Sequence, residues 1–334
     1  MEIKDIVGLS QPLTKLIEVV SCGIGHITKP YFIRKTADAK AYEIERIAKA
    51  IEQNNAAFKQ IEYDDTKIKL LQQKENLSDE AMQSYKELAD RATQRVAYRE
   101  TKRQINVENT IAQAAEELSK DQKVSKEPLN EDWINRYFNI IEDISSEEMQ
   151  NLWGKILAGE IRHPSTYSLR TLDVLRNISS FEAEVFCRIA AFALSSGDKA
   201  FIMYEEAFLE NELGIKFTDL LLLKDLGLMF PTELEFSFSP CEKETISHLI
   251  WGKLIIVVRR DNNTPKIPIQ AAVFTQTGKE LLNLVEKPMN ELYLKKLGTK
   301  LKINNDVHVF YGYILSVAGD SIHHTDLIEI TCTE

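Results

Sequence analysis

Cysteine is scarce in this sequence, and the few cysteines stand far apart. The 334 residues include four, Cys22, Cys187, Cys241 and Cys332, which never form a CxxC or CxxxC pair. Zinc sites and small disulfide-linked domains need closely spaced cysteines. We therefore expect no metal site and no disulfide framework, and the cysteine usage fits a protein of the reducing cytoplasm.

Positive charge is also in short supply. The chain has 41 lysine and arginine residues against 51 aspartate and glutamate residues, which gives a formal net charge of -10. Proteins that wrap nucleic acid present a broad basic surface, which argues against that class here. A local basic stripe is still compatible with an acidic chain.

Long hydrophobic runs are missing as well. No stretch of about 20 uncharged apolar residues occurs, so the sequence predicts no membrane-spanning helix. Lys4, Asp5, Lys15 and Glu18 interrupt the apolar residues near the N-terminus, so we also expect no signal peptide. Both absences favour a cytoplasmic protein.

The common catalytic and nucleotide-binding motifs are absent too. The sequence has no Walker A loop, no GxGxxG after a predicted strand, no GxSxG elbow and no HExxH. It therefore predicts no catalytic residues of these classes and no cofactor.

Residues 1–35 have the pattern of an amphipathic helix followed by the aromatic and basic segment "KPYFIRK". One interpretation is an interfacial helix, peripheral at the inner membrane. The other is a helix that docks on its own domain or on a neighbouring subunit, as most amphipathic helices do. The residues predicted to contact a membrane or a partner are Leu9, Leu13, Leu16, Ile17, Val20, Ile24, Tyr31 and Phe32.

Two long charged helices are predicted over residues 36–120. The first runs from Thr36 to about Tyr63, and the second from Asp79 to Leu118 without a glycine or proline. Such length without a helix breaker predicts a helical hairpin or coiled-coil arm. Arms of this kind usually mediate self-association, so we expect a homo-oligomer.

A basic stripe follows the second of these helices. Arg91, Arg95 and Arg99 recur every four residues, and Lys102 and Arg103 continue the stripe. It could bind the phosphates of nucleic acid or of lipid headgroups. The acidic chain favours the other interpretation, a solvated face paired with carboxylates.

Residues 131–196 predict a compact bundle of short helices. Asp132 and Ser168 stand at N-cap positions, and Ser145 stands three residues before Glu148 as in a capping box. The polar residues of the bundle invite a search for an active site. Caps and surface charge explain them without catalysis; they are Glu147, Glu148, Lys155, Glu160, His163 and Arg170.

Residues 197–334 alternate helical and extended segments. The strand Leu254–Arg260, a last helix Glu286–Leu297 and the run "FTDLLLLKDLG" predict an α+β domain that resembles a winged helix. Arg259 and Arg260 are its candidate nucleic-acid contacts. The predicted recognition helix is rich in leucine and aspartate, which favours a protein-interaction or structural role over nucleic-acid binding.

Two stretches of the central bundle carry a family resemblance. "DISSEEMQNLWGKILAGEI", followed by "PSTYSLRTLDVLRNISSFEAEVF", resembles the bacterial family DUF2806, a family of unknown function. The arm segment "RETKRQINVENTIAQAAEEL" and the opening of the chain are similar to the same family, so the likeness covers roughly the first two hundred residues. The "LW-K-LAGE" core and the "GxG…KP" opening also resemble proteins grouped with bacterial abortive infection. Neither resemblance implies catalytic residues.

The sequence thus predicts a mainly α-helical protein with an α+β C-terminal part. Its favoured function is that of a non-enzymatic, self-assembling interaction protein, an anti-phage factor that acts through residues 1–35 on a membrane or a protein partner. One alternative is a winged-helix regulator that binds nucleic acid. The second alternative is an enzyme with an unrecognised site in the central helical bundle.

Overall fold

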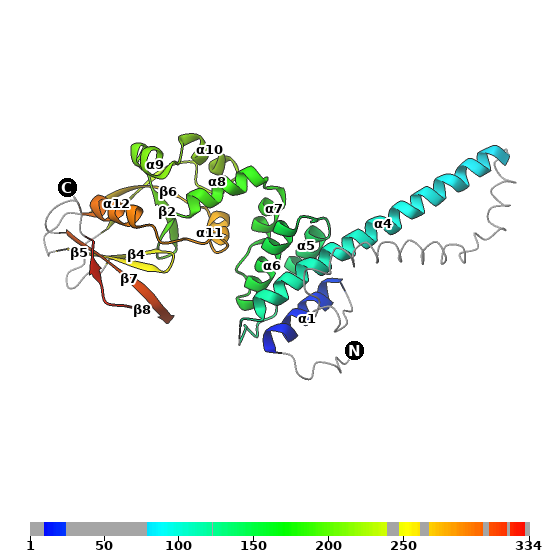
Figure 1. The fold of residues 1–334 in the computed structure, drawn as a ribbon, viewed down its shortest axis with the longest axis horizontal. Helices are drawn as coiled ribbons and strands as arrows, with labels where there is room; N and C mark the ends of the chain where they lie inside the picture. The colour runs from blue at the N-terminus through cyan, green and yellow to red at the C-terminus, as the bar shows by residue number, and fades with distance from the viewer. Residues whose placement is uncertain are drawn as a thin grey trace. The chain divides into compact units, whose positions relative to one another are not determined.

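A computed structural model describes residues 10–24, 79–121, 123–238, 247–260, 267–302, 307–318 and 321–330 (Figure 1). The chain divides into two compact units, with the boundary between Thr166 and Tyr167. The first unit is helical over its described residues, and the second combines helices with an antiparallel sheet. The predicted combination of helices with an α+β C-terminal part is confirmed.

The first unit is built around one long helix. This helix, α4, begins and ends at the predicted residues, Asp79–Leu118. The other described helices of the unit are α1 (Gln11–Ile24), α5 (Glu131–Ile141) and α6 (Glu147–Arg162). The C-terminal part of α4 packs along α6, and α1 contacts α4, α5 and α6 (Figure 1).

An aromatic cluster forms the centre of the helical unit. The ring of Tyr137 stacks on Trp133 at a centroid distance of 5.0 Å and meets Trp153 edge-on at 5.7 Å. The Tyr137 hydroxyl donates to the Trp153 carbonyl oxygen at 2.8 Å, so its polar end is satisfied inside the core. These contacts join α5 to α6.

Gly154 explains the close approach of α6 to α4. A Cβ atom at this position would lie 2.6 Å from the Cβ of Gln113 and 3.0 Å from the backbone nitrogen of Ala114. Only glycine avoids that clash, so the two helices meet backbone to backbone.

Two predicted helix caps are wrong. α5 is capped by Asn130, whose side chain accepts from the Trp133 amide at 3.0 Å, so Asp132 lies in the first turn. α6 follows Ser146 without a side-chain cap, and the predicted capping box between Ser145 and Glu148 does not form.

A tertiary contact explains why the capping box at Ser145 does not form. The Asn106 side chain of α4 donates to the Ser145 hydroxyl at 3.4 Å and to the Glu142 carbonyl oxygen at 2.7 Å. This contact between distant parts of the chain takes the place of the local cap.

The helices of the second unit include the last two helices of the predicted bundle. Ser168 caps α7 as predicted, and its hydroxyl accepts from the Thr171 amide at 3.3 Å. α7 contacts α11, and α8 contacts α10. The segment 131–196 is therefore shared between the two units. The helices are α7 (Leu169–Asn177), α8 (Ser180–Ala190), α9 (Glu206–Leu213), α10 (Phe217–Asp225), α11 (Gln276–Leu282) and α12 (Glu291–Leu301).

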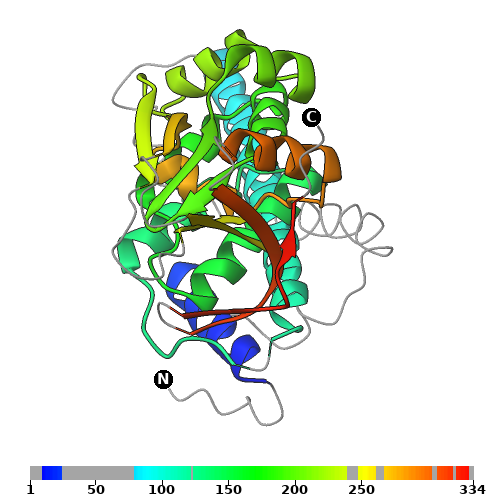
Figure 2. The same ribbon diagram turned by 90° about the vertical axis from the view of Figure 1, so that its left-hand side faces the viewer.

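One antiparallel sheet runs through the second unit in the order β3-β6-β2-β1-β4-β5-β7-β8, with β9 also paired to β7. Its strands are seen from a second side in Figure 2. β5 and β7 pair from Leu254 opposite Tyr313 to Arg260 opposite Val307. The strands are β1 (Leu194–Ser196), β2 (Lys199–Met203), β3 (Leu234–Phe238), β4 (Ser247–Trp251), β5 (Leu254–Arg260), β6 (Ile267–Val273), β7 (Val307–Ala318), β8 (Ser321–His324) and β9 (Ile328–Glu329).

α12 covers the core of this sheet. Tyr293, Leu294 and Leu297 of the helix are buried together with Leu254 and Ile256 of β5. The helix begins at Glu291, later than the predicted Glu286, because its start is set by two neighbouring residues. Pro288 disfavours helical geometry at the residue before it, and the Asn290 side chain caps the helix by accepting from the Tyr293 amide at 2.9 Å.

Some predictions fall on residues outside the described ranges. They are the first arm helix from Thr36 to Tyr63 and the predicted contacts Leu9, Tyr31 and Phe32. Within the described ranges, no helix is long and apolar enough to cross a membrane.

Candidate functional site

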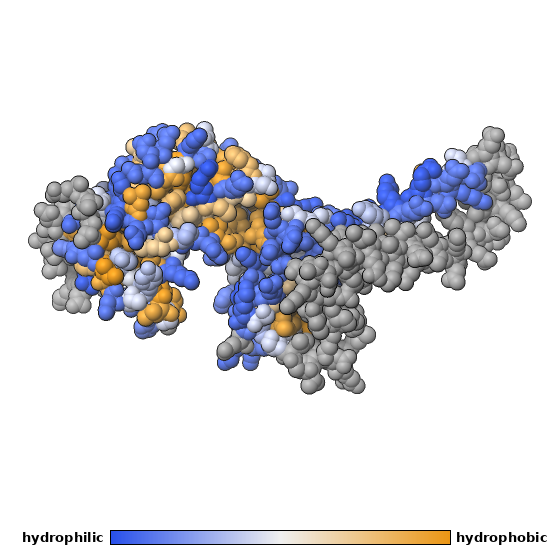
Figure 3. All heavy atoms as spheres, in the orientation of Figure 1, coloured by the Kyte–Doolittle hydropathy of each residue, from blue (hydrophilic) through white to orange (hydrophobic). Residues whose placement is uncertain are grey.

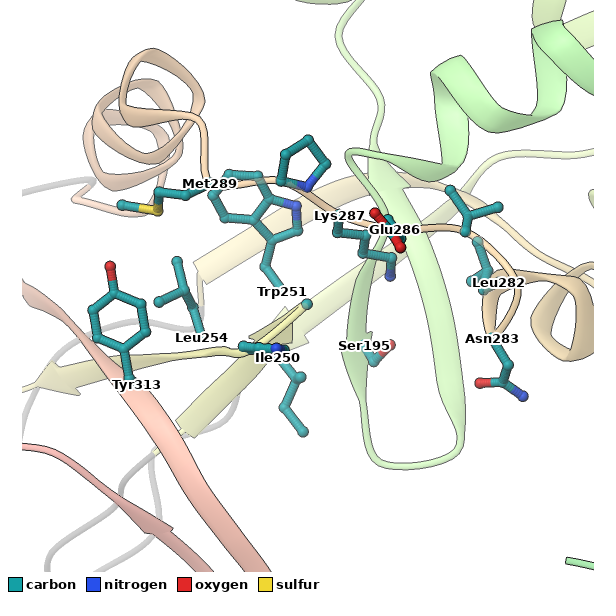
Figure 4. Close-up of a pocket in the computed structure, with 14 residues that line it drawn as sticks. Ser195, Ile250, Trp251, Leu254, Leu282, Asn283, Glu286, Lys287, Met289 and Tyr313 are labelled. Atoms are coloured by element: carbon teal, nitrogen blue, oxygen red, sulfur yellow. The ribbon is translucent and has the colours of Figure 1, made fainter. Parts of the chain in front are cut away.

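A pocket of about 930 Å³ opens in the second unit (Figure 4). Its walls come from the turn between β4 and β5, the chain between α11 and α12, the strand β1 and Tyr313 of β7. Few backbone pairs join the strands at this place, because β1 pairs with β4 only through Ser195 opposite Ile250. Both of these residues line the pocket.

Gly252 shapes the turn at the pocket's edge. Its φ angle is +59°, in the left-handed region that favours glycine. A Cβ atom here would lie 3.1 Å from the Cβ of Lys287 and 3.2 Å from its carbonyl oxygen. The turn therefore packs directly on the Lys287 backbone and holds that residue in the pocket wall.

Two residues that line the pocket, Trp251 and Lys287, are hydrogen-bonded to the chain that follows α8. Three successive carbonyl oxygens beyond this helix each accept one side-chain hydrogen bond. The Trp251 indole donates to Ala191 at 2.8 Å, the Tyr293 hydroxyl to Phe192 at 2.9 Å, and the Lys287 ammonium to Ala193 at 3.0 Å. These bonds satisfy backbone carbonyls directly after α8 and hold the chain where it leaves the helix.

Lys287 is the chemically distinctive group of the pocket. Its side chain is half-buried, and this burial lowers the pKa of its ammonium from 10.5 to about 8. In the part of the chain that the structure describes, no carboxylate forms an ion pair with it, and neighbouring Glu286 is exposed. At neutral pH the pocket therefore holds a poorly solvated cation.

A protein-family model described as "Protein of unknown function (DUF2806)" matches residues 90–298. The chain belongs to the DUF2806 family. The match reaches further than the resemblance read from the central bundle, since it continues through the second unit into α12. No curated protein and no solved structure matches the chain.

In this DUF2806 chain the N-terminal apolar stripe faces its own unit. Leu16 and Val20 are fully buried, and α1 contacts α5 and α6. A Cβ atom on Gly23 would lie 2.1 Å from the Phe138 ring, so the helix is seated tightly. Leu13 and Ile17 are half-buried, and Ile24 is exposed. Leu16 and Val20 are therefore not available to a membrane in this structure.

The basic stripe lies on α4, and several of its members are paired with carboxylates. Arg103 forms ion pairs with Glu142 at 3.4 Å and with Asp143 at 3.3 Å. Arg91 lies 4.0 Å from a Glu87 carboxylate oxygen, and Arg99 lies 3.1 Å from that of Glu100. Arg95 is exposed, and Lys102 is half-buried.

The structure assigns Arg259 a local role. Its guanidinium carbon lies 4.8 Å from the centre of the Phe310 ring, a cation–π contact between β5 and β7. Arg260 ends β5, where its backbone pairs with Val307. The side chain of Arg260 is not among those that the structure describes.

The polar residues of the central bundle are not brought together. Glu147 and Glu148 are exposed in the first turn of α6, and His163 follows the last turn. The 16 residues of that helix separate them by about 24 Å. Glu160 is buried and accepts from the Ser165 amide at 2.6 Å. Lys155 and Arg170 are exposed on α6 and α7.

The pocket has no signature in the sequence and was not predicted. Its residues come from four separate segments, and none of them belongs to a recognisable motif. The only local signal is the "EKPMN" break between two helices, which indicates a loop and not a site. In the described ranges, no group of three or more His, Cys, Asp or Glu side chains could hold a metal ion.

Proposed function

We propose that this DUF2806 protein is a non-enzymatic interaction protein that self-associates through the N-terminal half of α4. The observation that carries the proposal is the burial pattern of this helix. Among its described side chains, none before Ile105 is buried, whereas Ile111, Ala114 and Leu118 are core residues. From Gln83 to Gln104, a stretch of about 22 residues or about 33 Å of helix, no described side chain belongs to the core of the unit.

The exposed half of α4 still carries apolar side chains. Leu88 is 56%, Val96 47% and Tyr98 50% exposed. At about 100° per residue, the three lie within about 160° of arc. In Figure 3 the visible atoms of this part of α4 are mostly hydrophilic. Leu88 and Val96, about 80° apart, lie on one side of the helix, where they can pack against a second helix. A long helix of this kind gains stability chiefly from such packing.

The surroundings of the other predicted contacts shape this proposal. The acidic partners of Arg91, Arg99 and Arg103 favour a paired, solvated face over a phosphate-binding stripe. The burial of Leu16 and Val20 favours a docked α1, so the proposal assigns no membrane contact to them. The anti-phage role rests only on the sequence resemblance of the "LW-K-LAGE" core and the "GxG…KP" opening.

A winged-helix regulator is the second candidate. The order of the elements supports it: α9 and α10 lie between β2 and β3, and β6 pairs with both of these strands. The surface of α10 is poorly suited to nucleic-acid binding, because its exposed side chains include Phe217, Leu221 and Asp225. Lys224, the cation within α10, is held by Glu233 at 2.6 Å. We therefore propose a protein-interaction role for this part as well.

The test is the mass of the full chain in solution by light scattering after size-exclusion chromatography. We expect the wild type at a multiple of 38.2 kDa, and the double variant Leu88→Lys/Val96→Lys at the mass of one chain. Ser84→Lys/Gln94→Lys is the matched control, because it adds the same charge at exposed polar positions of the same helix. A monomeric wild type at high protein concentration would overturn the proposal.

A further inference from the structure

We propose that the pocket of the second unit binds a small organic monocarboxylate with an apolar body, whose carboxylate pairs with the Lys287 ammonium. The inference is independent of self-association, because the pocket and α4 belong to different units. It rests on the Lys287 ammonium, which has no carboxylate partner among the described residues, on the charge balance of the lining and on the apolar walls.

The described residues use only part of the hydrogen-bonding capacity of the Lys287 ammonium. An ammonium group has three N–H donors, and the Ala193 carbonyl oxygen accepts one of them at 3.0 Å. A cation taken partly out of water is costly unless an anion pairs with it. The side chain of Lys287 lines an open pocket, so a carboxylate entering from solvent can pair with its ammonium.

The charges and polar groups around Lys287 favour a ligand with a single negative charge. Lys253 and Glu286 also line the pocket, which gives the lining one excess positive charge. A phosphate dianion would be repelled by the Glu286 carboxylate and would lack a second buried cation. Ser195 and Asn283 lie on the same side of the pocket as Lys287 in Figure 4, and both side chains can donate to a carboxylate.

The remaining walls are apolar. Trp251, Leu254, Leu282, Met289 and Tyr313 line the pocket, and Figure 4 shows Met289 and Tyr313 on the side opposite Asn283. Small-molecule sites combine an apolar lining of this kind with a few placed polar groups. A volume of about 930 Å³ accommodates a ligand with one or two rings.

The competing explanation is that Lys287 serves only to anchor the end of α8. A cation near the C-terminal carbonyls of a helix is favourable in itself. That role predicts a loss of stability when Lys287 is replaced, but it predicts no preference of the pocket for anions. The two explanations therefore differ in ligand binding.

The experiment is isothermal titration of the full chain with 2-naphthoate and with its uncharged counterpart, 2-naphthamide. We expect 2-naphthoate to bind at least about tenfold more tightly than the amide, which is the effect of one charge pair worth about 1.4 kcal/mol. In Lys287→Met, which keeps the aliphatic stem, this preference should disappear. Lys279→Met is the matched control, since Lys279 also donates to a carbonyl oxygen, that of Asp198 at 2.7 Å, away from the pocket.

A second measurement needs no variant. The carboxylate binds the ammonium form, so the affinity of wild-type protein for 2-naphthoate should fall by about tenfold between pH 7.5 and pH 9.5 as Lys287 loses its proton. The affinity for 2-naphthamide should stay constant over this range. Failure of 2-naphthoate to bind at millimolar concentration, equal affinity for the two compounds, an unchanged preference in Lys287→Met, or a flat pH profile would each overturn the proposal.

Discussion

Glu108 makes the helical unit sensitive to pH. It lies on α4 among the core residues Ile105, Val107 and Ile111, and its carboxylate accepts from the Gln104 side chain at 3.2 Å. Burial raises the pKa of Glu108 from 4.5 to about 7. A raised pKa means that the folded state prefers the protonated carboxyl group.

The sign and size of the effect follow from this shift. Below about pH 4.5 Glu108 is protonated in both states and does not penalise folding. Its contribution to stability falls as the pH rises from about 4.5 to about 7, and the loss is complete above about 7. At 1.36 kcal/mol per pH unit the full difference is about 3.4 kcal/mol. The side chain keeps contact with water, and screening reduces this figure to about 1–2 kcal/mol.

The variant Glu108→Gln keeps the shape and removes the charge. We expect it to stabilise the protein by about 1–2 kcal/mol at about pH 8 and to change little at about pH 5. Urea unfolding, followed by circular dichroism at several pH values, measures the difference. The exposed Glu116 of the same helix provides the control, Glu116→Gln. Equal stabilisation of Glu108→Gln at both pH values would refute the reasoning.

Two further predictions concern the packing of each unit. Gly23→Ala places a methyl group against the Phe138 ring and should lower the free energy of unfolding by about 1–3 kcal/mol. Faster proteolysis within α1 would report this loss. The control Glu18→Ala changes an exposed residue of the same helix, and it should be cleaved at the wild-type rate. The buried Glu280 carboxylate accepts from the Ser168 amide at 2.7 Å and from the Thr171 hydroxyl at 2.6 Å. Glu280→Ala strands both donors, so we expect a loss of about 3 kcal/mol and a melting temperature lower by about 6–10 °C in calorimetry; an unchanged melting temperature would show that water replaces the carboxylate.

Elements with a strong local pattern were predicted residue by residue. α4 begins and ends where the absence of breakers places it, and the β-branched run Leu254–Arg260 is β5. Ser168 caps α7 because the partner of its hydroxyl, the Thr171 amide, lies three residues away. Such features depend on neighbours in the chain, which the sequence contains.

Features that depend on distant residues were predicted less well. The capping box at Ser145 fails because Asn106, 39 residues earlier, contacts the Ser145 hydroxyl. The boundary after Thr166 falls inside the predicted bundle because α7 packs on α11, more than a hundred residues further along. Neither partner leaves a trace in the local pattern.

The apolar stripe of α1 shows the same division. The sequence shows the periodicity of the stripe. From that periodicity alone the stripe could contact either a membrane or a protein surface. The fully buried Leu16 and Val20 show that α5 and α6 cover the stripe. An amphipathic pattern predicts that one face of a helix is covered, but the tertiary structure is needed to identify the elements that cover it.

The sequence by itself determined the element types, the excess of negative charge and the membership of the DUF2806 family, because each is a property of residue order and composition. The tertiary structure alone decided which faces remain exposed and that Ser195, Trp251, Lys287 and Tyr313 line one pocket. Those residues are separated by up to 118 positions, and only the pairing of β1 with β4 and of β5 with β7 brings their strands together. The unusual pKa of Lys287 follows from that assembly, because burial is a property of the fold and not of the residue.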